Sequence, residues 1–234
     1  MTNMTIELHT WNTPNGRKIS VALEEMGLPY KVIPVNITKG EQMAPQFLAL
    51  SPNNKIPAIV DPDGPDGKPM ALAESGAILM YLASKVDRFL PHTTRAKYEV
   101  LQWLMFQMGH VGPMLGQTHH FRMYAPQKID YAIDRYTNEA RRLYRVMDTR
   151  LAHSRYFVGS EYTIADIAIF PWLRSWKNQG IDWADYPHLK GWFDEVAARP
   201  AVQRGVEVLA DRRKALTDDK ARNVLFGEEQ YKRH

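Results

Sequence analysis

The sequence predicts a chain of two domains, an α/β domain followed by an all-helical domain. Up to about residue 90, short apolar stretches typical of strands alternate with stretches of helical periodicity. Beyond that point the strand pattern stops, and apolar residues recur every three or four positions. A length of 234 residues with 44% hydrophobic content is enough for two small cores. We expect the α/β domain to span residues 1–88 and the helical domain to span residues 93–234.

The elements of the first domain follow from apolar alternation, helical spacing and turn residues. We expect strands at residues 6–9, 30–35, 57–60 and 70–73. We expect helices at residues 19–26 and 42–50, and a third from residue 74. The first two strands need a right-handed crossover to lie parallel, whereas the last two can form a hairpin through the loop at residues 61–69. This order of elements is that of a thioredoxin-like domain.

The second domain shows only helical patterns. We expect helices at residues 95–108 and 127–151, a buried helix at residues 163–172 and a short helix between Pro187 and Pro200. Thr163 and Asp166 have the spacing of a capping box, with Asp in place of the usual Glu, and are interpreted as folding determinants. The many charges of residues 211–234 suggest an exposed or loosely packed arm.

Composition excludes several classes of protein. The net charge of +4 is modest and the basic residues are spread along the chain, which disfavours a nucleic-acid partner and suits a small anionic ligand. The apolar stretches are too short for a membrane span and the N-terminus lacks a signal-peptide core, so a cytoplasmic protein is expected. The chain has no cysteine, so any thiol chemistry must use a thiol of the ligand.

Two neighbouring motifs predict a socket for a small anionic peptide. In the first, Ile56-Pro57 enters an apolar strand; the proline removes one donor from the sheet and makes the peptide bond a candidate for the cis form. The exposed backbone beside it could pair with an extended ligand. In the second, Glu74 and Ser75 open a helix, whose free amide groups and positive end favour a carboxylate.

Four separated motifs, in the same order, resemble the nu class of the glutathione transferase superfamily. They are TPNGRKI at residues 13–19, KGEQ at 39–42, SPNNKIPAIV at 51–60 and GPMLGQTHHF at 112–121. The similarity covers nearly the whole chain up to about residue 210. It implies a thioredoxin-like domain that binds glutathione, a helical second domain, and a homodimer.

The residues that would activate the glutathione sulfur lie near the first turn. A hydrogen-bond donor to the sulfur lowers the thiol pKa and so raises the thiolate fraction. No Tyr occurs before Tyr30, and Ser20 lies too far into the helix to be a first choice. The resemblance assigns the sulfur contact to Asn15 and Thr13. Taken alone, Thr13, Asn15 and the following Gly are also a common turn signal.

The resemblance also implies a set of anchors for glutathione. Glu74 would pair with the γ-glutamyl ammonium group, and Ser75 would donate to the γ-glutamyl carboxylate. Ile56 would offer its backbone to the cysteinyl residue. Lys55 and Gln42 would reach the glycyl carboxylate or nearby groups.

A second group of residues could hold another glutathione or the substrate. Arg135 lies in a segment that also resembles the class, and a second glutathione would bring carboxylates that need such a cation. A solvated helix charge is the alternative interpretation of Arg135. Gln117 and His119 would line or support the same cleft. His119 and His120 are not expected to bind a metal, because adjacent helix positions point apart.

The predicted function is glutathione-dependent reduction of disulfide bonds, with two glutathione molecules or one glutathione disulfide held per site as co-substrate. Weak conjugating or peroxidase activity could accompany it. The alternatives are a general glutathione transferase that conjugates electrophiles, with an apolar wall from residues such as Met114 and Phe121, and a non-catalytic regulatory protein that binds glutathione. The expected partners are small thiols and disulfides.

Overall fold

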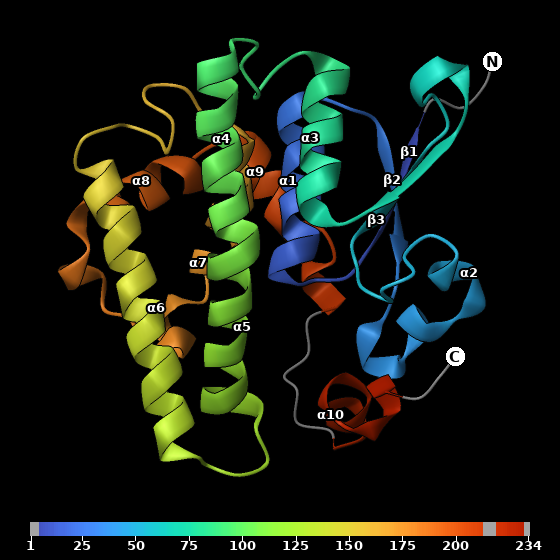
Figure 1. The fold of residues 1–234 in the computed structure, drawn as a ribbon. Helices are drawn as coiled ribbons and strands as arrows, with labels where there is room; N and C mark the ends of the chain where they lie inside the picture. The colour runs from blue at the N-terminus through green and yellow to red at the C-terminus, as the bar shows by residue number, and fades with distance from the viewer. Residues whose placement is uncertain (1–4, 213–218, 232–234) are drawn as a thin grey trace. The chain divides into compact units, whose positions relative to one another are not determined.

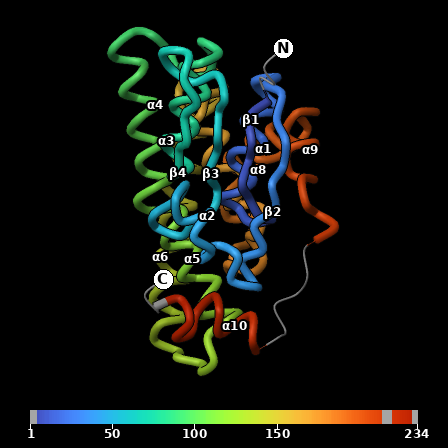
Figure 2. The backbone as a smooth tube through the Cα atoms, turned by 90° about the vertical axis from the view of Figure 1, so that its right-hand side faces the viewer, coloured from blue at the N-terminus to red at the C-terminus, as the bar shows by residue number. Residues whose placement is uncertain are grey.

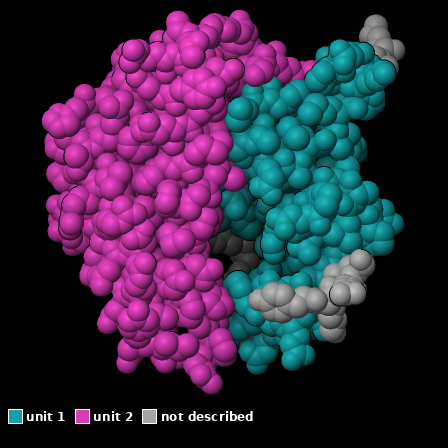
Figure 3. Space-filling model, viewed as in Figure 1, with its two compact units in different colours: residues 1–82, 204–234 teal, residues 83–203 magenta. Residues whose placement is uncertain are grey.

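A computed structural model describes residues 5–212 and 219–231 of the chain. The chain forms two compact units, coloured separately in Figure 3. One consists of Met1–Leu82 with Arg204–His234, and the other of Ala83–Gln203. The boundary near residue 82 lies a few residues before the one expected from the sequence. The last thirty or so residues group with the first unit, whereas the sequence placed them in the helical domain.

The first unit is built on a four-stranded mixed sheet. Its strands are β1 (Ile6–Thr10), β2 (Tyr30–Pro34), β3 (Ala58–Asp61) and β4 (Met70–Ala73). They lie in the order β2-β1-β3-β4, which can be followed in Figure 2. Strands β1 and β2 are parallel, and the other pairs are antiparallel. In Figure 1 the helices α1 (Pro14–Met26) and α3 (Ser75–Val86) lie on one face of this sheet and α2 (Pro45–Leu48) on the other. The predicted thioredoxin-like fold is confirmed.

Local signals explain where these elements begin and end. Thr13 caps α1 and Pro14 occupies its first turn, where a missing N–H costs nothing. Gly27 ends α1 with a φ of 67°, a left-handed conformation that glycine adopts without strain. The Ile56–Pro57 peptide bond is cis, as the sequence suggested. The helix expected at residues 42–50 is divided into a 3-10 helix, η2 (Glu41–Met43), and α2, and a further short 3-10 helix, η1 (Ile37–Lys39), precedes them.

The second unit is helical, as predicted. Its helices are α4 (Thr94–Phe106), α5 (Gly112–His119), α6 (Asp130–Leu151), α7 (Ile164–Leu173) and α8 (Pro187–Ala197). Two π-helical turns, at Gln107–Val111 and His120–Tyr124, precede and follow α5. In the described part of the chain, no helix combines the length and apolarity that a membrane span requires.

The predicted capping box of α7 is confirmed. The Thr163 hydroxyl accepts from the backbone at the start of the helix, and the Asp166 carboxylate accepts from the backbone N–H of Thr163 at 3.0 Å. Asp166 is fully buried and also accepts from the Phe157 N–H at 3.2 Å and from Nε1 of Trp192 at 2.9 Å. It therefore joins the start of α7 to the preceding loop and to α8.

The described part of residues 211–234 is mostly exposed or partly exposed, as expected for an exposed or loosely packed arm, and only Ala221 among its described residues is buried. The end of α9 (Pro200–Glu207) and the residues after it lie along α1, and α10 (Asp219–Phe226) packs against η1. The hydroxyl of Ser20 donates to the carbonyl of Gly205 at 2.6 Å, and Arg204 pairs with Glu24 at 2.6 Å. Residues 213–218 and 232–234 of the expected arm lie outside the described residues.

Candidate functional site

The sheet register gathers most of the predicted site residues of the first unit at one end of the sheet. His9 of β1 pairs with Ala58 of β3, and Ala58 pairs with Ala73 of β4 in an antiparallel manner. The end of β1, the start of β3 and the end of β4 therefore lie side by side at the same end of the sheet. The chain segments that hold Thr13, Ile56 and Glu74 continue from this same end. The parallel strand β2 also ends there and leads to η2, which carries Gln42.

Thr13 and Asn15 form the first turn of α1. The Thr13 hydroxyl oxygen accepts from the N–H of Gly16 at 3.1 Å, so its own proton is left to donate elsewhere. A Cβ atom at position 16 would collide with the backbone oxygen of Trp11, so this turn needs glycine there. Thr13 and Asn15 are both partly exposed. The turn therefore presents a hydroxyl and an amide beside the free N–H groups of a helix start.

The loop that leads into β3 is held by Ser51. Its buried hydroxyl donates to the carbonyl of Lys55 at 2.8 Å, which fixes the backbone just before Ile56. Ile56 is half-buried, and the Lys55 side chain is exposed. Gln42 is buried, and within the described residues its Oε1 atom has no hydrogen-bond partner. An acceptor buried in this way can pair with an N–H of a ligand.

Glu74 and Ser75 form the start of α3. Glu74 has a φ of 67°, which is unusual for a residue other than glycine, and its carbonyl accepts from the N–H of Ile78 at 2.9 Å. The Glu74 residue is exposed and Ser75 is buried. Lys18 of α1 donates from Nζ to the Ser75 hydroxyl oxygen at 3.2 Å. Burial lowers the pKa of Lys18 to about 7, although the charge of Glu74 acts in the opposite direction.

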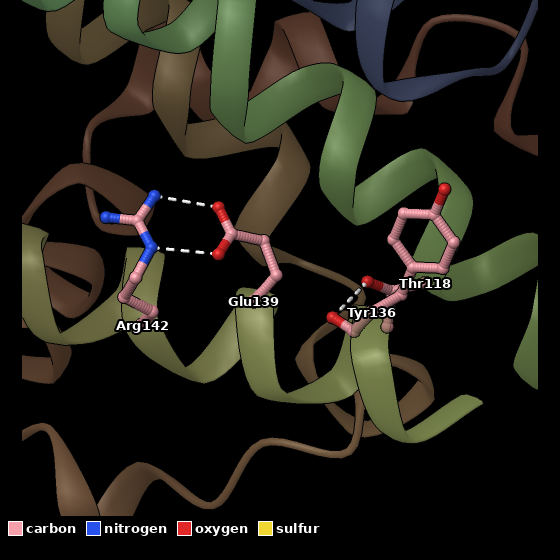
Figure 4. Close-up of polar contacts among 4 residues, drawn as sticks. All are labelled: Thr118, Tyr136, Glu139 and Arg142. Atoms are coloured by element: carbon pink, nitrogen blue, oxygen red, sulfur yellow. Dashed lines mark hydrogen bonds and ion pairs between the residues drawn. The ribbon is translucent and has the colours of Figure 1, made fainter. Parts of the chain in front are cut away.

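Gln117, His119 and Arg135 lie in the second unit, near the contact between α5 and α6. This contact is marked by Thr118, whose hydroxyl lies 3.0 Å from the carbonyl oxygen of Tyr136 (Figure 4). Gln117 and Arg135, which neighbour these two residues in sequence, are both exposed. His119 is about 200° around the helix from Gln117, and its ring stacks on Trp172 of α7 with centroids 6.4 Å apart. Gln117 and His119 therefore do not share a face.

Arg135 has a carboxylate one helical turn away. Glu139 binds Arg142 through both carboxylate oxygens, at 2.7 and 2.8 Å, as Figure 4 shows. These bonds lower the pKa of Glu139, and the charge of Arg135 contributes to the shift. Within residues 5–212 and 219–231, no three His, Asp or Glu side chains gather closely enough to hold a metal ion.

Sequence reasoning did not single out Lys18, because a lysine in a helix is usually exposed. In the structure, Lys18 lies within a stretch of α1 whose residues from Gly16 to Leu23 are all buried, which the sequence pattern alone did not indicate. Ser20, which the sequence did not favour for the sulfur contact, is buried, and its hydroxyl donates to the carbonyl of Gly205 at 2.6 Å.

Comparison with known families gives two matches. Residues 13–85 match the family model described as glutathione S-transferase, N-terminal domain, and residues 112–200 match the glutathione S-transferase C-terminal domain. Among curated proteins, the chain is 53% identical to the disulfide-bond oxidoreductase YfcG of Escherichia coli over 198 residues, which is 84% of this chain and 92% of that protein. It is 39% identical to the disulfide-bond oxidoreductase YghU of the same organism, over 86% of this chain and 73% of that protein.

Solved structures give concordant matches. A glutathione transferase from Pseudomonas putida, with one glutathione disulfide bound per subunit, superposes with a TM-score of 0.85 and 42% identity, over 88% of this chain and 93% of that one. A glutathione transferase from Burkholderia graminis, with two glutathione molecules bound per subunit, gives a TM-score of 0.83 and 43% identity, over 87% of this chain and 88% of that one.

Proposed function

The chain belongs to the glutathione S-transferase family, and from that premise we propose that it is a glutathione-dependent disulfide-bond reductase. The observation that carries the proposal is the gathering of Thr13, Ile56 and Glu74 at one end of the sheet in a chain without cysteine. Two of its curated relatives are named disulfide-bond oxidoreductases. Related structures bind either two glutathione molecules or one glutathione disulfide per subunit.

In the proposed complex, glutathione lies along the end of the sheet. The start of α3 receives its γ-glutamyl end, where Ser75 and the positive helix end suit the carboxylate and Glu74 suits the ammonium group. The backbone of Ile56 pairs with the cysteinyl residue. The buried Oε1 of Gln42 accepts an N–H of the ligand near the glycyl end, and the exposed Lys55 meets the glycyl carboxylate.

The sulfur would then lie at the first turn of α1. Thr13 and Asn15 donate to it, and the helix start favours a negative charge, so the thiolate forms more readily than in water. The Thr13 oxygen is already engaged by the N–H of Gly16, which directs its proton outward. Loss of the Asn15 amide would remove a donor to the sulfur and leave the residues that hold the two ends of glutathione in place. It should therefore lower reactivity more than binding.

The reaction uses only ligand sulfur. The thiolate of one glutathione attacks a disulfide RSSR, forms the mixed disulfide GSSR and releases RS⁻, which takes up a proton. A second glutathione thiolate attacks the glutathione sulfur of GSSR, releases the second RS⁻ and leaves glutathione disulfide. Two glutathione thiols are oxidised and one disulfide is reduced. The protein orients the sulfurs and stabilises the thiolate.

Several finer points belong to the same proposal. We infer membership of the nu class, a homodimer and a cytoplasmic location. Arg135 would bind a carboxylate of the second glutathione, in competition with Glu139 of its own helix. Gln117 and Arg135 are both exposed and available to a ligand, whereas His119, stacked on Trp172, would support the site rather than touch the ligand.

The test couples reduction of 2-hydroxyethyl disulfide by glutathione to NADPH consumption through glutathione reductase, with and without the protein. A rate well above background is expected. A parallel assay measures glutathione conjugation to an aryl halide. A faster conjugation than disulfide reduction would favour the conjugating transferase, and tight glutathione binding without either activity would favour a regulatory binding protein.

A further inference from the structure

Residues 204–209 contact α1 along its whole length. Four side-chain contacts join the two segments. From the end of α1 toward its start, the pairs are Glu24 with Arg204 at 2.6 Å, Ser20 with Gly205 at 2.6 Å, Arg17 with Val206 at 3.4 Å and Asn12 with Leu209 at 2.8 Å. The segment therefore runs antiparallel to α1, and its last contact is with the turn that precedes the helix.

The contact between Asn12 and Leu209 has features that stability alone does not explain. Leu209 has a φ of 57°, a left-handed conformation that is costly for a residue other than glycine. Its carbonyl accepts from Nδ2 of Asn12 at 2.8 Å and also from the N–H of Arg212 at 3.1 Å. The other end of the Asn12 amide, Oδ1, is buried and has no hydrogen-bond partner within the described residues. Backbone strain and unpaired buried acceptors are typical of functional sites.

Asn12 lies inside a turn that is folded closely on itself. The N–H of Thr13 donates to the carbonyl of Trp11 at 2.7 Å, across Asn12. A Cβ atom at position 16 would lie 2.3 Å from the same carbonyl oxygen, so Gly16 is also packed against it. A shift of the Asn12 backbone would therefore be passed on to Thr13.

We propose that Asn12 is a positioning residue for Thr13: its amide, held by the carbonyl of Leu209, fixes the turn so that the Thr13 hydroxyl faces the glutathione sulfur. The inference rests on the sulfur site of the proposed function. Without this hydrogen bond the turn would move, the donor to the sulfur would be less well placed, and the thiol would hold its proton more tightly.

The contact is not implied by membership of the family. Neither Asn12 nor the segment 204–209 lies in the stretches that the family models match, which are residues 13–85 and 112–200. The inference makes a segment almost two hundred residues away part of the arrangement that sets thiol reactivity.

The experiment measures the pKa of the glutathione thiol in the complex, from the ultraviolet absorbance of the thiolate as a function of pH. It compares the wild-type protein with Asn12→Leu, because leucine has nearly the same shape and cannot donate. We expect the variant to raise this thiol pKa by roughly 0.5 to 1, and to slow disulfide reduction about three- to tenfold when the rate is measured below that pKa. An unchanged thiol pKa would overturn the inference.

Binding and stability should not follow the same course. The dissociation constant of S-methylglutathione, which has no thiol, should change less than about twofold, because the residues proposed to hold both ends of glutathione are intact. The Leu209 carbonyl keeps its bond from Arg212 and leucine removes an unpaired acceptor, so the melting temperature should stay within about 2 °C of wild type. A loss of affinity as large as the loss of rate, or a larger fall in melting temperature, would show a general structural role instead.

Two further variants serve as checks. Asn12→Ala cannot crowd the turn and should raise the thiol pKa by a similar amount. Asn223→Leu, which changes an exposed asparagine of α10, is the control and should leave the thiol pKa, the affinity and the melting temperature as they are in the wild-type protein.

A double-mutant cycle with Thr13→Val tests whether Asn12 acts through Thr13. In the Thr13→Val protein, Asn12→Leu should slow the reaction by less than about twofold more, since the donor that it positions is already absent. Losses that multiply in full would overturn the inference. If the wild-type protein binds glutathione without lowering its thiol pKa, the proposed sulfur site is wrong. If the wild type lowers this pKa and Asn12→Leu lowers it equally, the sulfur site stands and only the role of Asn12 is wrong.

Discussion

Replacement of Asp166 by alanine tests the packing of the helical unit. The carboxylate is fully buried and accepts from three N–H groups, on Thr163, Phe157 and Trp192, at 3.0, 3.2 and 2.9 Å. Alanine offers no acceptor, and the side chain of Trp192 is itself buried. All three donors would therefore lose their partner in a place that water does not reach.

Two opposing contributions set the change in the free energy of unfolding of Asp166→Ala. Each buried donor left without an acceptor costs roughly 1–3 kcal/mol, or about 6 kcal/mol for three. The second contribution has the opposite sign, because the variant no longer buries a carboxylate charge. Burial raises the pKa of Asp166 from 3.8 to about 6. At about 1.4 kcal/mol per pKa unit, removal of the buried charge stabilises the variant by about 3 kcal/mol. We expect a net loss of about 3 kcal/mol, equivalent to a melting temperature lower by roughly 6–12 °C.

Thermal unfolding followed by circular dichroism and tryptophan fluorescence measures this loss. The raised pKa means that the folded chain holds a proton on Asp166 more tightly than the unfolded chain does. The stability that this group contributes is therefore greatest below about pH 4 and declines as the pH rises through 6. The gap between wild type and Asp166→Ala should be wider at pH 5 than at pH 7.

The matched control is Asp194→Ala, which removes an exposed carboxylate of α8 that pairs with Lys190. Surface ion pairs of this kind contribute little, so its melting temperature should stay within about 2 °C of wild type. If Asp166→Ala also melts within about 2 °C of wild type at both pH values, the account of the capping box as a buried polar centre is refuted.

Three further predictions concern the first unit. Asn15→Ala should lower disulfide reduction roughly tenfold to a hundredfold while the dissociation constant of glutathione changes no more than about twofold; equal losses in rate assays and calorimetry would contradict a role at the sulfur. Glu74→Ala should raise that dissociation constant about tenfold, and an unchanged value would show that the anchor is misassigned. Because burial lowers the pKa of Lys18 from 10.5 to about 7, the folded chain binds fewer protons than the unfolded chain in this range, so Lys18 makes the ligand-free protein more stable as the pH rises from about 7 toward 10. Lys18→Met should remove that rise, and identical pH dependence of melting in both proteins would disprove it.

The elements that could be predicted are those with local determinants. The turn at residues 13–16 depends on Pro and Gly, the cis bond on Pro57, and the start of α7 on Thr163 and Asp166, all of which act within a few residues. The alternation of strand and helix patterns was sufficient for the fold class.

The features that could not be predicted depend on pairs far apart in the sequence. The hydroxyl of Ser20 meets the carbonyl of Gly205, 185 residues later, and neither residue carries a local mark of the other. Burial of Lys18 follows from the docking of α1 on α3, which no periodicity encodes. Ile129 falls within the helix expected at residues 127–151, but it lies just before α6 and is 46% exposed.

The packing of residues 204–209 along α1 also has a consequence for the order in which the molecule is completed. Asn12 donates to the carbonyl of Leu209 at 2.8 Å across 197 residues, and Gly205 lies so close to Val21 that a side chain there would collide with it. During synthesis residues 1–82 leave the ribosome before residues 204–209, which cover α1, have been made. Contacts of such long range form late in folding. The cover of α1 is therefore completed only when translation has nearly ended, and chains released early lack the contacts that residues 204–209 make with Asn12 and with the helix at which glutathione would react.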